Sequence, residues 1–309
     1  MAKKKITVVG AGNVGATTAQ LLAYKKLGNV CLLDVLEGIP QGKVLDLMES
    51  APLENFDCKL FGLNSYEETA NSDIVILTAG LARKPGMSRE DLRDKNAEIV
   101  KMCAEEVIKY SPDCFMIVVT NPVDTMTWVA KKYSCLPKNR ILGMAGVLDS
   151  TRFRSFISME LGVSNEDVHA TVLGLHGNDM VPMPRFSSVA GIPITELLPK
   201  EKIDEMIERT KKGGAEIVQL LKTGSAYYAP ASSVVNMVAS IVREKNRILP
   251  AAAFLDGEYG IKGIFMGVPL KLNWSGIEEI IELPLTEDER KQLMSSAEAV
   301  RKSVASLKV

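Results

Sequence analysis

Short apolar runs alternate with amphipathic stretches through the first half of the chain. Most of the runs are rich in β-branched residues and too short for buried helices, as expected of buried strands. They lie at residues 6–9, 30–33, 57–63, 73–78, 115–119 and 140–142. Helices are predicted between them at residues 16–25, 41–49, 91–109 and 125–133. This alternation predicts an α/β fold with a doubly wound parallel sheet.

The pattern changes after residue 143. Helices are predicted at residues 148–161, 203–222, 225–244 and 286–307, the second of them interrupted at Gly213-Gly214. A strand at 168–173 leads into His176, and residues 251–283 suggest an antiparallel meander. Thr286 and Glu289 have the spacing of a capping box. We therefore expect a Rossmann domain at residues 1–145 and a C-terminal α+β substrate domain at 146–309, with a soft boundary.

A glycine-rich motif joins the first predicted strand to the first helix. Gly10 suits a tight turn, Gly12 lets a pyrophosphate approach the backbone, and Gly15 lets helix and strand pack closely. The N-terminus of the helix favours phosphate. Asp34 ends the second strand, where its carboxylate can bind an adenosine ribose and repel a 2′-phosphate. An ordinary glycine turn is the alternative, but this context favours NAD binding, with NAD preferred to NADP.

Composition excludes several classes of function. The formal net charge of −1 argues against nucleic acid or an anionic membrane as a partner. The sequence offers no window long and apolar enough for a bilayer, and its basic start lacks the apolar region of a signal peptide. The five cysteines show no metal-ligand spacing, so we expect no metal and a reduced, cytoplasmic protein.

Acid–base chemistry has one strong candidate, His176, which lies between Gly174 and Gly177 after a predicted strand. An imidazole can take a hydroxyl proton near neutral pH, although a structural histidine is the alternative, and we assign that structural role to His169. Asp149 and Arg152 lie three residues apart on a predicted helix and alone suggest a surface ion pair. Beside His176, the carboxylate can hold the imidazole and the guanidinium can bind a substrate carboxylate.

Two further arginines, Arg83 and Arg89, lie on the loop after the fourth predicted strand. A solvated basic loop is one interpretation. The alternative is a mobile loop that closes over an anionic substrate.

The motifs taken together resemble the lactate/malate dehydrogenase superfamily, in matching order along nearly the whole chain. They are GAGNVG at 10–15, Asp34, AGLARKPGMSRED at 79–91, TNPVD at 120–124, GVLDSTRFR at 146–154 and GLHGNDMVP at 174–182. The RKPGMSR segment is similar to the malate dehydrogenases of the lactate-dehydrogenase-like group. Two departures lie beside His176, namely Leu175 and the pair Asn178-Asp179, and they leave the local geometry open.

The resemblance implies a role for individual residues. His176 would be the acid and base, Asp149 its orienting partner, and Arg89 the group that polarises the carbonyl. The implied substrate-binding residues are Arg83, Arg89, Asn121 and Arg152. The implied cofactor-binding residues are Gly10, Ala11, Gly12, Asn13, Val14, Gly15, Asp34, Asn96, Val119, Thr120 and Asn121. Arg83 occupies the specificity position, where malate enzymes carry Arg and lactate enzymes typically carry Gln.

The implied activity is NAD-dependent oxidation of malate to oxaloacetate, with a small dicarboxylate as substrate. A lactate-type dehydrogenase is the nearest alternative, and Arg83 argues against it because its charge would face a methyl group. An NAD- and metal-dependent glycosidase and a non-catalytic NAD-binding protein are more distant alternatives. The family also suggests a homodimer or homotetramer, with residues 41–49 as a candidate interface.

Overall fold

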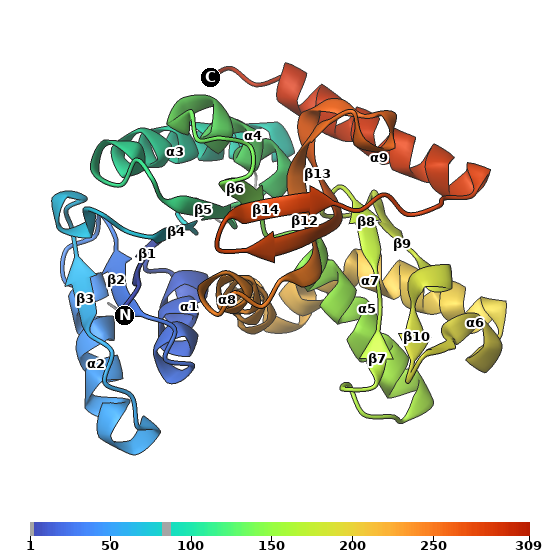
Figure 1. The fold of residues 1–309 in the computed structure, drawn as a ribbon, viewed down its shortest axis with the longest axis horizontal. Coiled ribbons are helices and arrows are strands. Elements are labelled where there is room, and N and C mark those ends of the chain that lie inside the picture. Colours follow the sequence, from blue (N-terminus) through green and yellow to red (C-terminus); the bar gives the residue numbers. More distant parts are fainter. Residues whose placement is uncertain (1–2, 82–87) are drawn as a thin grey trace.

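The computed structural model describes residues 3–81 and 88–309. An eleven-stranded mixed sheet runs through this part of the chain (Figure 1). Its parallel half has the order β3-β2-β1-β4-β5-β6. These strands are β1 (Lys5–Val9), β2 (Asn29–Leu33), β3 (Leu60–Leu63), β4 (Ile74–Leu77), β5 (Phe115–Val118) and β6 (Ile141–Gly143). The predicted doubly wound parallel sheet is confirmed.

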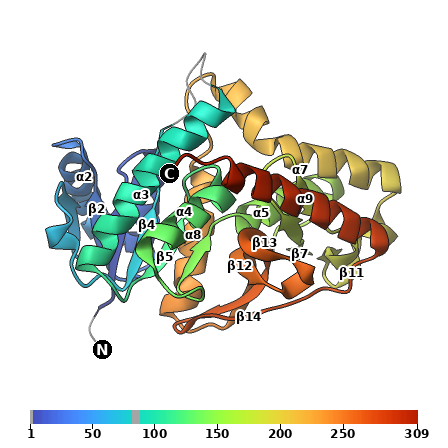
Figure 2. The same ribbon diagram turned by 90° about the horizontal axis from the view of Figure 1, so that it is seen from above.

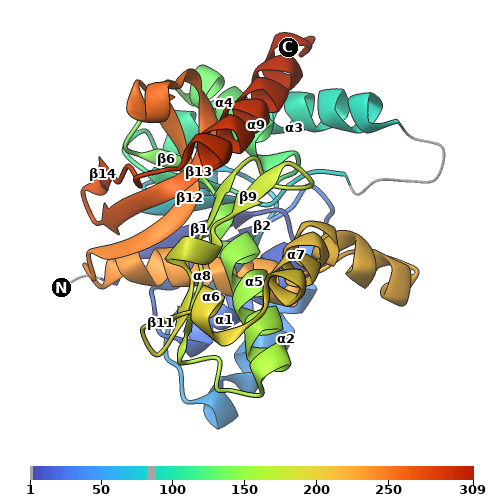
Figure 3. The ribbon, with the colours of Figure 1, turned by 90° about the vertical axis from the view of Figure 1, so that its right-hand side faces the viewer.

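Helices cover both faces of the parallel half. On one side lie α1 (Asn13–Tyr24) and α2 (Ile39–Glu54), and on the other lie α3 (Arg89–Tyr110) and α4 (Val123–Ser134) (Figure 3). Side chains alternate between the two layers, because Ile6 and Val8 pack in the cluster of α1 while Val9 packs in that of α3 and α4. Apolar side chains on both faces explain the continuous apolar runs of the sequence.

The C-terminal half continues the same sheet. The antiparallel meander consists of β12 (Arg247–Asp256), β13 (Lys262–Asn273) and β14 (Gly276–Ile280), as predicted, although its first two strands are long. β12 pairs with β6 through Ala252 and Gly143, and the order β12-β13-β8-β9 completes the sheet. The two halves of the chain therefore share one sheet.

The single strand predicted at 168–173 was wrong. The structure divides it into β7 (Val168–His169) and β8 (Val172–Gly174). β8 pairs with β13 and β9 (Met180–Pro182), whereas β7 joins a separate small sheet with β10 (Ser188–Val189) and β11 (Ile192–Pro193). The predicted strand is divided because its first part and its last part pair within different sheets.

Five helices complete the C-terminal half. They are α5 (Gly146–Leu161), α6 (Ile194–Leu197), α7 (Lys200–Leu221), α8 (Tyr228–Val242) and α9 (Glu287–Ala305), with 3₁₀ turns elsewhere at Glu67–Thr69, Pro184–Phe186 and Glu258–Gly260. α8 packs against α1, and α9 lies along the same side as α4 (Figure 2). Thr286 and Glu289 form the predicted capping box. The expected interruption of the helix predicted at 203–222 was wrong, since α7 runs unbroken through Gly213 and Gly214.

α2 is longer than predicted and turns part of its apolar surface outward. Val44 is buried, but Leu45 and Met48 are 59% and 50% exposed. Within residues 3–81 and 88–309, no helix combines the length and apolarity needed to cross a membrane.

Candidate active site

His176 lies on a turn that is fixed from several sides. The turn follows β8, and Gly174 and Gly177 have φ values of +87° and +130°, which glycine adopts most readily. The backbone N–H of Leu175 donates to Oγ of Ser296 on α9 at 2.7 Å. The backbone N–H of His176 donates to Oδ2 of Asp124 on α4 at 2.9 Å. Elements from both halves of the chain therefore hold this histidine.

The imidazole of His176 meets Asp149, as the sequence predicts. Nδ1 lies 2.8 Å from Oδ2 of Asp149, whose side chain is only 2% exposed in the first turn of α5. A helix N-terminus stabilises a carboxylate, and the carboxylate in turn holds a proton on Nδ1. Burial disfavours the imidazolium, but the charge and hydrogen bond of Asp149 outweigh it, so the pKa of His176 is raised. The pair therefore holds a proton more tightly than a free imidazole does.

Arg152 lies beside Asp149, but its N–H donors are not all used by that contact. Its Nη1 lies 3.6 Å from Oδ1 of Asp149, an ion pair too long for a hydrogen bond. Its buried Nε has no hydrogen-bond partner among the described residues. The side chain, 13% exposed, lies against Gly213 and Gly214 of α7. A confined guanidinium with unused donors next to His176 suits a planar carboxylate.

The glycine motif forms a tight turn between β1 and α1. Gly10 has φ of +103°, and a Cβ there would lie 2.8 Å from the backbone nitrogen of Ala79. A Cβ at Gly15 would overlap the carbonyl oxygen of Gly10. Beside Gly12, in contrast, the space is open, and α1 begins at Asn13 with no side-chain cap on its N–H groups. Open space in front of uncapped N–H groups fits the pyrophosphate of a dinucleotide.

Asp34 lies directly beside this turn. Its Oδ2 accepts a 2.6 Å hydrogen bond from the backbone N–H of Ala11, and its Oδ1 accepts one of 3.0 Å from Leu36. Lys43 of α2, a residue with no predicted role, donates from Nζ to the carbonyl oxygen of Ala11 at 2.6 Å. A lysine on a predicted helix carries no signal of such a contact. The carboxylate of Asp34 and the ammonium group of Lys43 thus both bind the backbone of Ala11.

The end of β5 brings the remaining predicted cofactor residues together. Val119 and Thr120 are buried, and Oγ1 of Thr120 donates to the carbonyl of Ala79 at 2.7 Å. Asn96, 1% exposed, accepts from the N–H of Leu81 and donates to the carbonyl of Asn121, both at 2.8 Å. Asn121 itself is exposed. Asn96 therefore braces the backbone on which Asn121 is presented.

Two predicted residues cannot be placed. Arg83 lies outside the described residues, and so does the side chain of Arg89, although its backbone begins α3. The departures noted beside His176 do not disturb the site, because Leu175 packs against the apolar core, while Asn178 and Asp179 are exposed.

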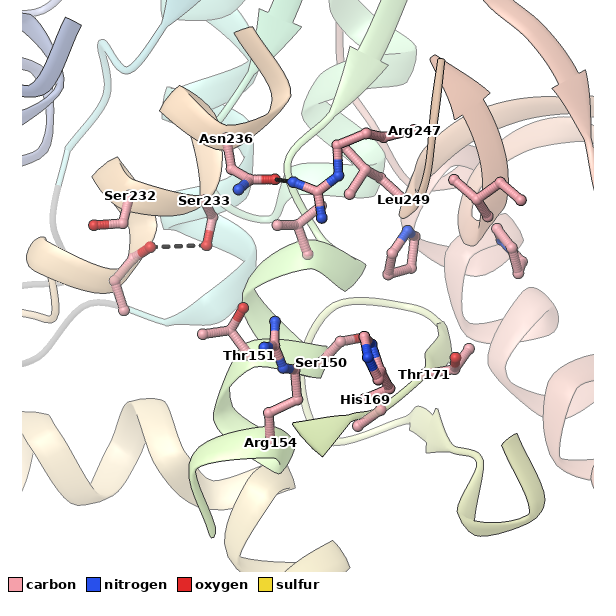
Figure 4. A pocket seen from close by; sticks show the side chains of 16 residues that line it. Ser150, Thr151, Arg154, His169, Thr171, Ser232, Ser233, Asn236, Arg247 and Leu249 are labelled. Carbon is pink, nitrogen blue, oxygen red and sulfur yellow. Dashed lines mark hydrogen bonds between the residues drawn. The ribbon is translucent and has the colours of Figure 1, made fainter. Parts of the chain in front are cut away.

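A separate cavity of about 420 Å³ opens on another face of α5 (Figure 4). Arg154, His169 and Arg247 line it, and His176 does not. Arg154 lies in the middle of the same helix as Asp149 and Arg152 but points to this second face. The cavity is thus distinct from the histidine site.

Two family models match the chain. The model for the lactate/malate dehydrogenase NAD-binding domain matches residues 4–143, and the one for the α/β C-terminal domain matches residues 146–308. A malate dehydrogenase of Heliobacterium modesticaldum is 55% identical over 305 residues, which are 99% of each chain.

Solved structures agree with these matches. Malate dehydrogenase of Cryptosporidium parvum superposes with a TM-score of 0.97 at 43% identity, covering 99% of each chain. Lactate dehydrogenase of the same organism, in complex with lactic acid and nicotinamide adenine dinucleotide, has a TM-score of 0.95 at 41% identity and covers 99% of this chain and 98% of its own.

Proposed function

The chain belongs to the lactate/malate dehydrogenase family, and from this premise we propose that His176, Asp149 and Arg152 form the catalytic centre of its reaction. That reaction is the reversible, NAD-dependent oxidation of malate to oxaloacetate. NAD, when bound, accepts and returns the hydride, while the protein binds, orients and moves a proton. The observation that carries the proposal is the 2.8 Å contact between Nδ1 of His176 and Oδ2 of Asp149.

Proton transfer falls to His176. With Nδ1 held by Asp149, Nε2 is the nitrogen that accepts the hydroxyl proton of malate or returns a proton to oxaloacetate. Burial opposes the charged ring, but Asp149 raises the pKa of His176, so the imidazolium that forms during malate oxidation is stabilised.

Substrate binding falls to arginines. Arg152 forms a bidentate ion pair with the carboxylate next to the reacting carbon, because Asp149 accepts no hydrogen bond from its guanidinium. Arg83 binds the second carboxylate, and Arg89 polarises the carbonyl as negative charge develops on its oxygen. A charged Arg83 disfavours the monocarboxylic alternative, since the guanidinium would then face an apolar methyl group.

Cofactor binding falls to the N-terminal half. The turn from Gly10 to Gly15 and the start of α1 receive the pyrophosphate, while Asp34 receives the adenosine ribose. Asn121, braced by Asn96, lies between cofactor and substrate. We place the domain boundary at residues 145 and 146, between the end of β6 and the start of α5.

Assembly and location complete the proposal. The exposed Leu45 and Met48 on α2 suit a contact between copies of this chain, in a homodimer or homotetramer. All five cysteines are free, which fits a reducing cytoplasm.

The test is oxidation of NADH with oxaloacetate, run beside pyruvate, for the natural sequence and for His176→Asn. We expect a marked preference for oxaloacetate, and no measurable turnover but normal NADH binding in the variant. The matched control is His169→Asn, which changes the exposed histidine of β7 and should keep full activity. Turnover of His176→Asn equal to that of the control would remove His176 from the reaction.

A further inference from the structure

Asp124 is a buried carboxylate for which the reaction described above has no use. It lies in the first turn of α4 and is 0% exposed. Its Oδ2 accepts the 2.9 Å hydrogen bond from the backbone N–H of His176. Its Oδ1 is buried without a hydrogen-bond partner among residues 3–81 and 88–309. A carboxylate buried with one oxygen unsatisfied is costly, so its position calls for an explanation.

The location of Asp124 ties two parts of the site together. It follows Asn121 by three residues in the N-terminal half, whereas His176 belongs to the C-terminal half. His176 is thus held at its ring by Asp149 and at its backbone N–H by Asp124. A change in Asp124 therefore reaches the proton carrier directly.

The charges around His176 show what this carboxylate does. Asp149 and Arg152 of α5, whose opposite charges offset each other, and Asp124 of α4 are charged groups that act on His176. α9 adds the uncharged hydroxyl of Ser296, on the neighbouring Leu175. An ionised Asp124 leaves the cluster neutral when His176 is protonated.

The protonation states of Asp124 and His176 influence each other. Burial raises the pKa of Asp124 to about 7, and the hydrogen bond and charge of His176 oppose that rise. The charge of Asp124 acts in the other direction on His176 and helps to raise its pKa against the effect of burial. When His176 loses its proton, Asp124 becomes an uncompensated buried charge and takes up a proton more readily.

We propose that Asp124 is a positioning residue for His176. Its carboxylate holds the backbone N–H of His176, and its negative charge favours the protonated imidazole. The proposal rests on the assignment of His176 as the proton carrier. It gives the reaction two carboxylates with separate tasks, since Asp149 orients the ring and Asp124 fixes the turn and balances the charge.

The test uses Asp124→Asn, which keeps an oxygen to accept the N–H of His176 and removes the charge. The chain has only two histidines, so NMR of protein with ¹³C-labelled imidazoles follows both, with His176→Asn to assign the signals. We expect the midpoint of His176 to fall by about 0.5 to 1 pH unit and that of the exposed His169 to stay unchanged. The pH at which kcat/KM for oxaloacetate declines should fall by the same amount.

The matched control is Thr125→Val, one residue along α4. Oγ1 of Thr125 makes a 2.8 Å hydrogen bond with Oγ of Ser303 on α9, so this variant also loses a buried contact between the halves but none with His176. It should leave the midpoint of His176 unchanged. If Asp124→Asn does not fold, the smaller Asp124→Ser, which also lacks the charge, serves in its place with the same expected shift.

A midpoint within 0.2 pH unit of the natural protein in the charge-free variant would overturn the proposal. This failure differs from failure of the proposed function. Absence of oxaloacetate reduction in the natural protein would refute the function, whereas the midpoint of His176 still reports on Asp124. Normal reduction with an unmoved midpoint would refute the role of Asp124 alone.

Discussion

Gly213 in the interior of α7 offers a sharp test of the Arg152 assignment, because a side chain at this position would meet Arg152. An alanine in a helix interior is favoured over glycine by about 0.8–1.0 kcal/mol. A Cβ at Gly213, however, would lie 3.2 Å from Cδ of Arg152. Non-bonded carbons prefer about 3.5–4.0 Å, so Arg152 has to shift by a few tenths of an ångström.

The size of the loss follows from the sensitivity of catalysis to position. Misplacing a reacting group by about 1 Å costs about 10²-fold in rate. A shift of about 0.3–0.5 Å then corresponds to a loss of about four- to tenfold in kcat/KM for oxaloacetate, if the logarithm scales with distance. The KM for NADH should not change, because Arg152 is not part of the cofactor site.

Gly214→Ala is the matched control. It makes the same change in the same helix, but the new Cβ would lie 3.6 Å from Nη2 of Arg152, an ordinary contact distance. We expect it to raise Tm by about 2 °C, the amount that about 1 kcal/mol gives a chain of this size, with kcat/KM unchanged. Equal kcat/KM for the Gly213→Ala and Gly214→Ala proteins would refute the claim that α7 sets the position of Arg152.

Three further predictions concern the cofactor, the proton and the substrate. Asp34 should give a strong preference for NADH over NADPH, since a 2′-phosphate would meet its carboxylate; equal kcat/KM for the two cofactors would contradict this. Because Asp149 raises the pKa of His176, kcat/KM for oxaloacetate should be constant at low pH and fall as pH rises through that pKa. Asp149→Asn should move this fall to lower pH and, by losing a charge-assisted hydrogen bond of about 1.5–3 kcal/mol, reduce kcat/KM by about ten- to 150-fold; an unmoved pH profile would count against the pair. Arg83→Gln should remove a partner of a buried charge, at about 2–5 kcal/mol, and reduce kcat/KM for oxaloacetate by about thirty- to several-thousand-fold without harming pyruvate reduction; an unchanged ratio between the two substrates would show that specificity lies elsewhere.

Local pattern was sufficient for the parallel half of the sheet, whereas for the residues around His176 it left structural alternatives open and the family resemblance supplied the implied roles. Strands buried on both faces produce continuous apolar runs, and these are visible without knowledge of the partners. The spacing of Asp149 and Arg152 on one helix likewise predicted that they would share a face. The 3.6 Å ion pair between their side chains agrees with that prediction.

Pairing between distant segments was not visible in local pattern. The strand predicted at 168–173 became two strands because β7 and β8 pair within different sheets, and these partners are distant in the sequence. Gly213 and Gly214 looked like a helix interruption because glycine disfavours helices. Their packing against Arg152 gives a reason for glycine there that local propensity does not contain.

Residues whose side chains bind the backbone of another residue were the hardest to predict. Lys43 touches the carbonyl of Ala11, and Asp124 the N–H of His176, so both bind atoms that every residue possesses. Neither contact imposes a spacing or a residue type that a sequence pattern can reveal. Asp124 was part of a recognised motif and still had no assigned task, because a motif identifies a residue without showing what it touches.

The sequence boundary near residue 145 does not correspond to a boundary in packing. β6 from the N-terminal half pairs with β12 from the C-terminal half, and α1 packs against α8. The hydrogen bond between Asp124 and His176 crosses the same junction at the proposed catalytic centre. A hinge between the halves would have to break strand pairing and separate Asn121 from His176.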